Sequence, residues 1–181
     1  MAPRKGIALR FVAPLAAVAT IALVGIAACG GAPSDSRIGV TVPDRSQFPP
    51  VSDVLDHRCG SLDCHGNRQR NMIVYGCEGL RLDPADAPGC RASGGKNTTV
   101  AEYDATFRSL VGLEPAVMSS VVAGKGADPE LLTFVRKARG TEGHKGGQLF
   151  TAGDPQDTCV TTWLGGKTNT DACTAALTGT P

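Results

Sequence analysis

The feature that most constrains this chain is its set of seven cysteines, because each thiol must be paired, modified, bound to a cofactor or left free. The number is odd, so at least one cysteine has a role outside pairing with the others. Aromatic residues make up only 4% of the 181 residues, so cross-links or a buried cofactor are expected to supplement the core. The cysteines are Cys29, Cys59, Cys64, Cys77, Cys90, Cys159 and Cys173.

The first cysteine follows a segment that is typical of a secretory signal. Residues 1–10 carry three basic residues and no acidic one, and residues 11–26 are almost entirely apolar. The segment ends in small residues before Cys29, as cleavable signals do. The alternative, a transmembrane anchor, is disfavoured because the apolar run is short and contains Pro14.

Ile26-Ala27-Ala28-Cys29 resembles the lipobox of bacterial lipoproteins. The resemblance implies removal of a signal peptide at residues 1–28 and acylation of Cys29, which would anchor the protein to a membrane of the cell envelope. Residues 29–47 are then expected to form a flexible tether. Gly30 favours the outer membrane, facing the periplasm or the surface, because an Asp there would resemble an inner-membrane retention signal.

Cleavage before Cys29 leaves 15 basic and 17 acidic residues, which argues against nucleic acid as a partner. Apolar periodicity and capping residues predict a mainly α-helical domain over residues 48–181. The expected helices open at Pro49, at Thr99 with a Thr–Glu capping box, at Pro115, at Asp128-Pro129, at Asp154-Pro155 and at Asp171.

The helical pattern is interrupted between residues 60 and 97. Residues 71–75 and 79–83 are short β-like runs on either side of Gly76-Cys77-Glu78. They predict a small β-hairpin within a loop-rich insert.

The second and third cysteines belong to the motif Cys59-Gly-Ser-Leu-Asp-Cys64-His65, which ends in Cys-His as c-type haem attachment sites do. In such sites two thiols bond the porphyrin and the histidine ligates iron. Four residues separate Cys59 from Cys64, where two are usual. Gly60 and Ser61 would allow the additional residues to bulge outward.

The context of this motif resembles the cytochrome c family. An apolar-faced helix over residues 51–59 runs directly into the cysteines. Glu78-Gly-Leu-Arg-Leu-Asp83 resembles the Gly-Leu-Arg-Leu-Asp segment of planctomycete-type c-cytochrome domains. Residues 122–137, with Asp128-Pro129, and residues 160–166, with Trp163 and Gly165, resemble two later helices of those domains in the same order.

The resemblance implies a small cytochrome c-like helical domain with one covalent haem c. Cys59 and Cys64 would hold the haem and His65 would be the proximal iron ligand. These domains commonly supply a distal Met before the last helix, where this chain has His144 instead. His144 is therefore the expected distal ligand, and Met118 is the alternative, although it also fits the apolar face of its helix. His57, on the helix before the motif, is expected to be solvated or locally bonded.

The remaining four cysteines are disulfide candidates, because an exported protein lies in an oxidising compartment. Cys77 and Cys90 flank the loop-rich insert and are expected to pair across it. Cys159 and Cys173 lie on the last two helices and are expected to link them.

Three functions follow from these residues. The first is a lipid-anchored electron carrier, not an enzyme, that exchanges electrons with a redox partner protein. The second is a non-catalytic envelope lipoprotein with a degenerate cytochrome-like fold, in which Cys59 and Cys64 form a disulfide. The third is a zinc site built from Cys59, Cys64, His65 or His144. No hydrolase or phosphate-binding motif is present.

Overall fold

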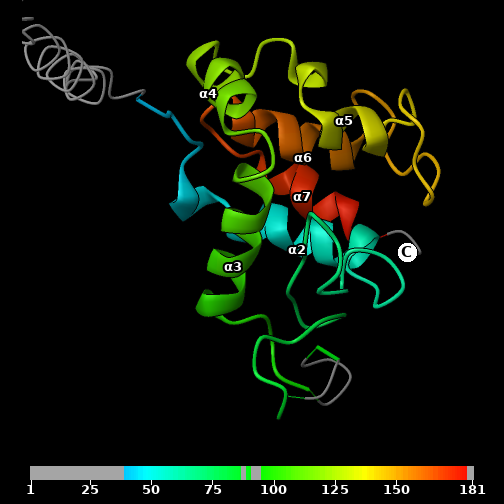
Figure 1. The fold of residues 1–181 in the computed structure, drawn as a ribbon. Helices are drawn as coiled ribbons and strands as arrows, with labels where there is room; N and C mark the ends of the chain where they lie inside the picture. The colour runs from blue at the N-terminus through cyan, green and yellow to red at the C-terminus, as the bar shows by residue number, and fades with distance from the viewer. Residues whose placement is uncertain (1–38, 87–88, 91–94, 179–181) are drawn as a thin grey trace, which may run out of the picture. The chain divides into compact units, whose positions relative to one another are not determined.

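The computed structural model describes residues 39–86, 89–90 and 95–178 of the chain. The prediction of a mainly helical protein is confirmed for these residues (Figure 1). The α-helices are α2 (Pro49–Cys59), α3 (Val100–Val111), α4 (Pro115–Ala123), α5 (Thr133–Ala138), α6 (Pro155–Leu164) and α7 (Thr170–Ala176). Two 3-10 helices accompany them, η2 (Arg45–Gln47) and η4 (Pro129–Leu131). Cys29 lies outside the described residues.

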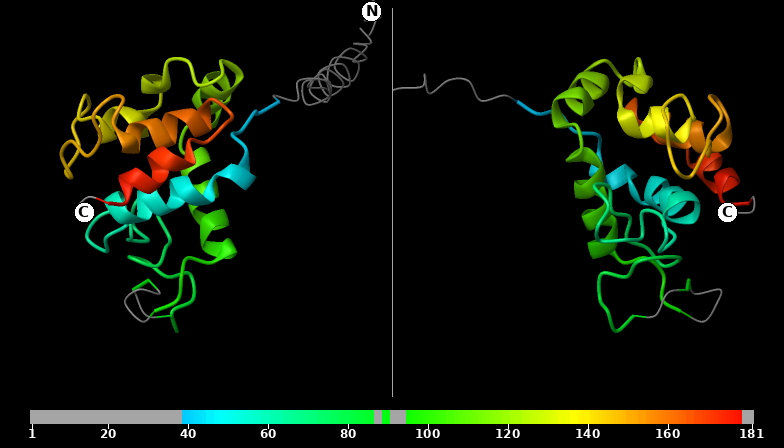
Figure 2. Two further views of the ribbon diagram at one scale, coloured as in Figure 1. Left: turned by 180° about the vertical axis from the view of Figure 1, so that it is seen from behind. Right: turned by 45° about the vertical axis from the view of Figure 1, so that its right-hand side comes forward.

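Helices α2, α6 and α7 pack side by side, and α3 packs across α2 (Figures 1 and 2). Their shared core centres on Trp163, which is fully buried. The ring of Phe48 lies 4.9 Å from Trp163 between centroids, and the ring of Phe107 lies 6.2 Å away. Three of the few aromatic residues therefore meet at one point, which concentrates their apolar area where the helices converge. Among the described residues, no helix has the length and apolar character to cross a bilayer.

The chain before α2 packs on this core. Trp163 donates its indole N–H to the carbonyl of Asp44 at 3.0 Å, and the Thr168 amide donates to the Gln47 side chain at 2.8 Å. The amide of Thr41 donates to Ser119 at 2.9 Å. The compact unit begins at Val40, so the last part of the expected tether at residues 29–47 is folded.

Two expected helix starts, at Thr99 and at Asp154, are confirmed together with their caps. Thr99 and Glu102 form a reciprocal capping box at the start of α3. Asp154 accepts a hydrogen bond from the amide of Asp157 at 2.7 Å at the start of α6. In both helices a side-chain oxygen satisfies an amide that has no partner within the helix.

The helix expected to begin at Asp128-Pro129 is interrupted. The 3-10 helix η4 ends at Leu131, Leu132 is extended (ψ 126°), and α5 begins at Thr133. The cause is distant in sequence, because the Glu114 carboxylate accepts from the amide of Thr133 at 2.7 Å and from its hydroxyl at 2.9 Å. A carboxylate from outside α5 thus caps its start.

The last helix also starts differently from the prediction. The side chain of Asn169 accepts from the amide of Ala172 at 3.0 Å and is the N-cap of α7. Asp171 lies inside the first turn, where its negative charge favours the positive end of the helix dipole.

The predicted β-hairpin of the insert is wrong for the described residues, which contain only an isolated bridge between Tyr75 and Leu80. The backbone donors that a hairpin would use are bound by side chains of α3. The amide of Ile73 donates to Ser109 at 2.6 Å, and the amide of Tyr75 donates to Thr106 at 2.9 Å. Side chains of α3 therefore accept these two hydrogen bonds in place of the backbone of a second strand.

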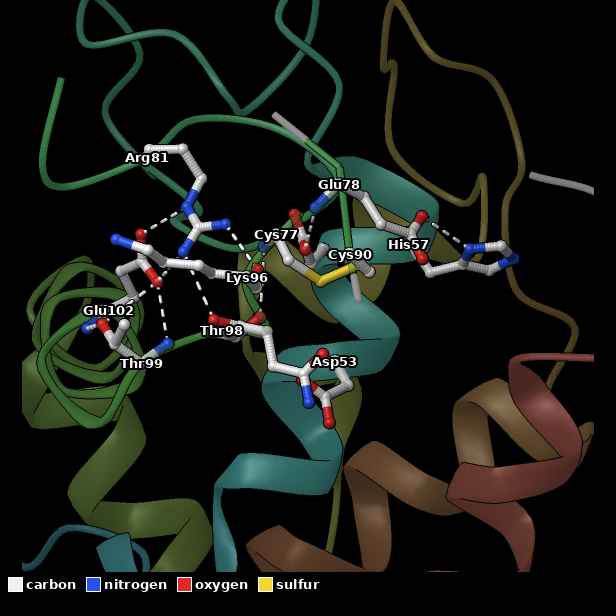
Figure 3. Close-up of a disulfide and its surroundings, with 12 residues drawn as sticks. Asp53, His57, Cys77, Glu78, Arg81, Cys90, Lys96, Thr98, Thr99 and Glu102 are labelled. Atoms are coloured by element: carbon white, nitrogen blue, oxygen red, sulfur yellow. Dashed lines mark hydrogen bonds and ion pairs between the residues drawn. A yellow bond between two sulfur atoms is a disulfide. The ribbon is translucent and has the colours of Figure 1, made fainter. Parts of the chain in front are cut away.

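The insert has a polar centre rather than an apolar one (Figure 3). The guanidinium of Arg81 donates to the Glu102 carboxylate at 2.8 Å, and both side chains are almost fully buried. The same carboxylate accepts from the amides of Leu82 and Thr99 at 3.0 and 2.8 Å. Burial alone would raise the pKa of Glu102, but these amide donors and Arg81 outweigh it and lower the pKa.

A second buried carboxylate, Asp56 of α2, lies where the insert packs on the helix. It accepts from the amide of Glu78 at 2.9 Å through Oδ2, while Oδ1 has no partner among the described residues. A Cβ at Gly76 would lie 2.1 Å from Oδ2, so only glycine fits there. Burial raises the pKa of Asp56 to about 6; the Glu78 amide opposes this shift, and the nearby carboxylates of Glu78 and Asp53 add to it.

Both expected disulfides are present. Cys77 is bonded to Cys90 within the insert, as Figure 3 shows, and Cys159 is bonded to Cys173 between α6 and α7. The two links close loops of similar length, with sequence separations of 13 and 14. One link belongs to the insert and the other to the helical body.

Candidate functional site

A cavity of about 670 Å³ lies between the segment after α2 and the loop after α5, which are on the same side of the unit in Figures 1 and 2. Its volume is within the range of small-molecule and cofactor sites. Its lining brings together the four predicted site residues Cys59, Cys64, His65 and His144. The apolar part of the lining is formed by Leu55, Met72, Leu113, Phe134, Leu149 and Phe150.

One wall of the cavity is formed by the loop that joins Cys59 to His65. The amide of His65 donates to the Cys59 carbonyl at 2.9 Å, and the amide of Cys64 donates to the Ser61 carbonyl at 2.9 Å. Ser61, Leu62 and the other inserted residues before Cys64 are exposed, apart from Gly60. The long spacing is therefore accommodated by an outward bulge, and His65 remains hydrogen-bonded to the end of α2.

The ring of His65 is oriented by a backbone oxygen. Its Nδ1 lies 2.9 Å from the carbonyl of Met72, and its own carbonyl accepts from the amide of Val74 at 2.9 Å. Met72 and Val74 are buried. A histidine whose Nδ1 donates to a carbonyl has Nε2 as its metal-binding nitrogen, which is the usual arrangement of ligating histidines.

The two cysteines of the loop are free thiols that differ in exposure. Cys59 is buried at the end of α2, and burial raises the pKa of its thiol to about 12. Cys64 is exposed at the edge of the cavity. The structure does not join the two in the disulfide that the degenerate-fold hypothesis requires.

His144 lines the same cavity from the loop between α5 and α6. Its ring centroid is 5.9 Å from that of His65, and the two ring planes are inclined by 23°. Its Nδ1 lies 3.3 Å from the carbonyl of Gly147, which leaves Nε2 for a metal. A metal–imidazole bond is about 2 Å long, so a centroid separation near 6 Å leaves room for one metal ion between two imidazole rings.

Charged side chains surround the cavity. Arg70 donates to the carbonyls of Cys64 and Asp63 at 3.1 and 3.0 Å, which ties down the bulged loop. Lys137 pairs with Glu142 at 2.9 Å and donates to the carbonyl of Gly143 at 2.9 Å. The apolar lining and polar edge suit a cofactor with an apolar body and ionised substituents.

The structure separates the other two predicted candidates from the cavity. Met118 of α4 is buried in the hydrophobic core (1% exposed) and does not line the cavity. Of the two candidates for the distal ligand, the arrangement therefore favours His144. His57 forms an ion pair with Glu78, with Nδ1 2.8 Å from the carboxylate, as Figure 3 shows. It is locally bonded, as expected.

Two contributors to the site were not identified from the sequence. The carbonyl of Met72 acts through the backbone, which leaves no signature in the side-chain pattern. Gly146 packs against the His144 ring, and a Cβ there would lie 3.0 Å from its Cε1. The run of glycines around His144 was a visible signal, but it did not indicate which glycine touches the ring.

The donor set suits haem better than a bare metal ion. Within the described part of the chain, no group of three or more His, Cys, Asp or Glu side chains is placed to hold a metal ion, as a zinc site would require. A c-type haem needs only two thiols and one or two axial ligands from the protein. These are the residues that meet in the cavity.

Comparisons with protein-family models, with curated proteins and with solved structures found no match.

Proposed function

We propose that this domain is an electron-transfer protein that binds one covalent haem c in the cavity between His65 and His144. The observation that carries the proposal is the convergence of Cys59, Cys64, His65 and His144 on one cavity. These residues come from two segments about 80 positions apart in the chain, so their convergence is a property of the fold.

Each residue has a defined part. Cys59 and Cys64 would each add S–H across a vinyl group, so that sulfur bonds one carbon, the hydrogen goes to the other, and no external oxidant is needed. His65, whose Nδ1 is held by the Met72 carbonyl, and His144 would hold the iron. The haem supplies one-electron chemistry, with a potential set by its axial ligands and burial.

The cavity walls favour this role over substrate turnover. Leu55, Phe134 and Phe150 are buried residues of the cavity lining and would surround the haem with apolar side chains. Cys64 at the exposed edge would leave one side of the porphyrin near the surface, where a redox partner protein can approach.

The membrane location is a separate part of the proposal. We propose that Cys29 carries the lipid anchor and that the domain lies at a bacterial envelope membrane, on the lipobox-like residues 26–29 alone. Palmitate labelling of the full chain should be lost in Cys29→Ser. Labelling that persists would overturn the anchor without affecting the haem proposal.

The haem proposal is tested by expressing the full chain in a host that attaches c-type haem. Denatured protein should retain haem by peroxidase stain and by absorption. Cys64→Ser should weaken or abolish this signal, and His144→Ala should change the low-spin spectrum. His57→Ala is the matched control, because His57 is bonded to Glu78 and does not line the cavity. Wild-type protein without covalent haem, with Cys59 and Cys64 oxidised, would overturn the proposal in favour of the degenerate lipoprotein.

A further inference from the structure

The two histidines of the cavity are held to very different extents. His65 is fixed by its amide, its carbonyl and its ring nitrogen, through bonds of 2.9 Å each to Cys59, Val74 and Met72. The ring of His144 has one polar contact among the described residues, at 3.3 Å to Gly147 three positions later. His144 is therefore less constrained than His65.

The segment around His144 is anchored at its ends and not at its centre. Towards its beginning, Glu142 pairs with Arg136 and Lys137. At its end, the amides of Leu149 and Phe150 both donate to the Ala138 carbonyl at 2.9 Å. Between them, the hydrogen bonds of residues 144–147 that the structure describes stay within that turn. The turn can move outward without breaking either anchor.

Glycines make this movement easy. Gly140 precedes the His144 turn and Gly147 ends it, with φ values of +70° and +72°, a region that other residues rarely adopt. His144 itself is only partly buried, so its ring can leave the cavity towards solvent. On the His65 side, the neighbouring Met72 and Val74 are buried, although His65 is itself only partly buried.

We infer that His144 is a displaceable ligand and that the domain binds a small exogenous iron ligand, such as cyanide or carbon monoxide, in its place. This inference rests on the proposed haem function. The ligand's affinity is reduced by the competition with His144, because the iron can hold only one ligand on that side. Any change that weakens the His144 contact should therefore raise the affinity for the ligand.

Two glycines of the turn provide a matched test. A Cβ at Gly146 would lie 3.0 Å from His144 Cε1 and 3.3 Å from Nδ1, so Gly146→Ala should push the ring from its position. A Cβ at Gly143 would meet no atom within 4 Å, and Gly143 does not have a positive φ. Gly143→Ala is thus a control with the same chemical change in the same loop.

The experiment uses full-chain protein that has passed the peroxidase stain, so that a missing haem is detected first and attributed to the proposed function. Cyanide is titrated into the ferric protein and carbon monoxide into the ferrous protein, with absorbance as the readout. Wild type should bind both saturably. His144→Ala should bind cyanide at least about tenfold more tightly and Gly146→Ala several-fold more tightly, while Gly143→Ala should match wild type.

Two results would overturn the inference. If wild type binds neither probe at large excess while His144→Ala binds both, His144 is a fixed ligand. If His144→Ala has the spectrum and cyanide affinity of wild type, His144 is not an iron ligand. In the second case covalent haem would still support the proposed function, so the two failures are distinguishable.

Discussion

The loop-rich insert and the helical body are stabilised by different interactions. In the body, Trp163, Phe48 and Phe107 form an apolar centre where helices converge. Where the insert packs on α3 and α2, the buried groups are charged. Arg81 is paired with Glu102 of α3, and the Asp56 carboxylate of α2 accepts from the backbone of the insert. Apolar contacts tolerate small shifts, whereas buried polar groups lose much of their stabilisation when one partner is displaced. The insert, which carries His65, therefore depends on exact polar pairing, whereas the body depends on apolar packing.

The largest expected effect comes from the centre of the body. Trp163→Ala removes the largest fully buried side chain and its hydrogen bond to Asp44, and it should lower the free energy of unfolding by about 4 kcal/mol. Chemical denaturation measured by circular dichroism checks this. Leu131→Ala, at a 53% exposed position, is the control and should change little. A small loss in Trp163→Ala would mean that the helices do not depend on this centre.

The two disulfides compare the regions directly, because their loops are nearly equal in length. Replacing both Cys159 and Cys173 by Ala should lower helix-monitored stability by about 3 kcal/mol, the value expected for loops of this size. Replacing Cys77 and Cys90 should mainly destabilise the insert and should lower helix-monitored stability by less. Equal losses by helix-monitored denaturation would contradict this separation and make the insert and body one cooperative unit.

The pH dependence of stability should report Asp56. Its pKa is about 6 in the folded protein, against an ordinary value of 3.8, so between these values the folded state binds more protons than the unfolded state. The contribution of this group to the free energy of unfolding therefore falls as the pH rises from about 4 to about 6, by at most about 3 kcal/mol.

Asp56→Asn should remove this fall and raise stability at neutral pH, because an amide oxygen can still accept from the Glu78 amide. Denaturation curves at several pH values measure the slope. Asp128→Asn, at an exposed site, is the matched control. An unchanged slope in Asp56→Asn would assign the pH dependence to another group.

The smallest of these effects concerns the polar centre of the insert. Arg81→Met should cost about 2 kcal/mol, because Glu102 loses its guanidinium partner but keeps the amides of Leu82 and Thr99. Hydrogen exchange should increase in the insert and not in α6. Arg45→Met, which removes the exposed pair with Asp104, should cost less than about 1 kcal/mol. Faster exchange throughout the body would show that the buried pair supports both regions.

The same contrast explains how much could be predicted. The helices of the body follow from apolar periodicity and local caps such as Thr99 and Asp154, which act within one turn. The break before Thr133 and the missing hairpin depend on Glu114 and on Ser109 and Thr106, which are remote in sequence. Local sequence patterns do not indicate contacts between residues this far apart in the chain.

The candidate site divides in the same way. Cys59, Cys64 and His65 lie within seven residues of sequence and form a recognisable motif, and both disulfide pairings were predicted correctly. His144 was expected from its position before α6, and the structure places it in the lining of the same cavity as His65, with ring centroids 5.9 Å apart. The Met72 carbonyl and the contact of Gly146 with the His144 ring arise only from folding.

The bonds that hold the N-terminal arm have a mechanical consequence. Tension applied to the chain at Val40 would be met by Ser119, which holds Thr41, and by Trp163, which holds Asp44. Neither Ser119 nor Trp163 lines the cavity. The arm is thus fastened to α4 and α6 by contacts that do not involve His65 or His144.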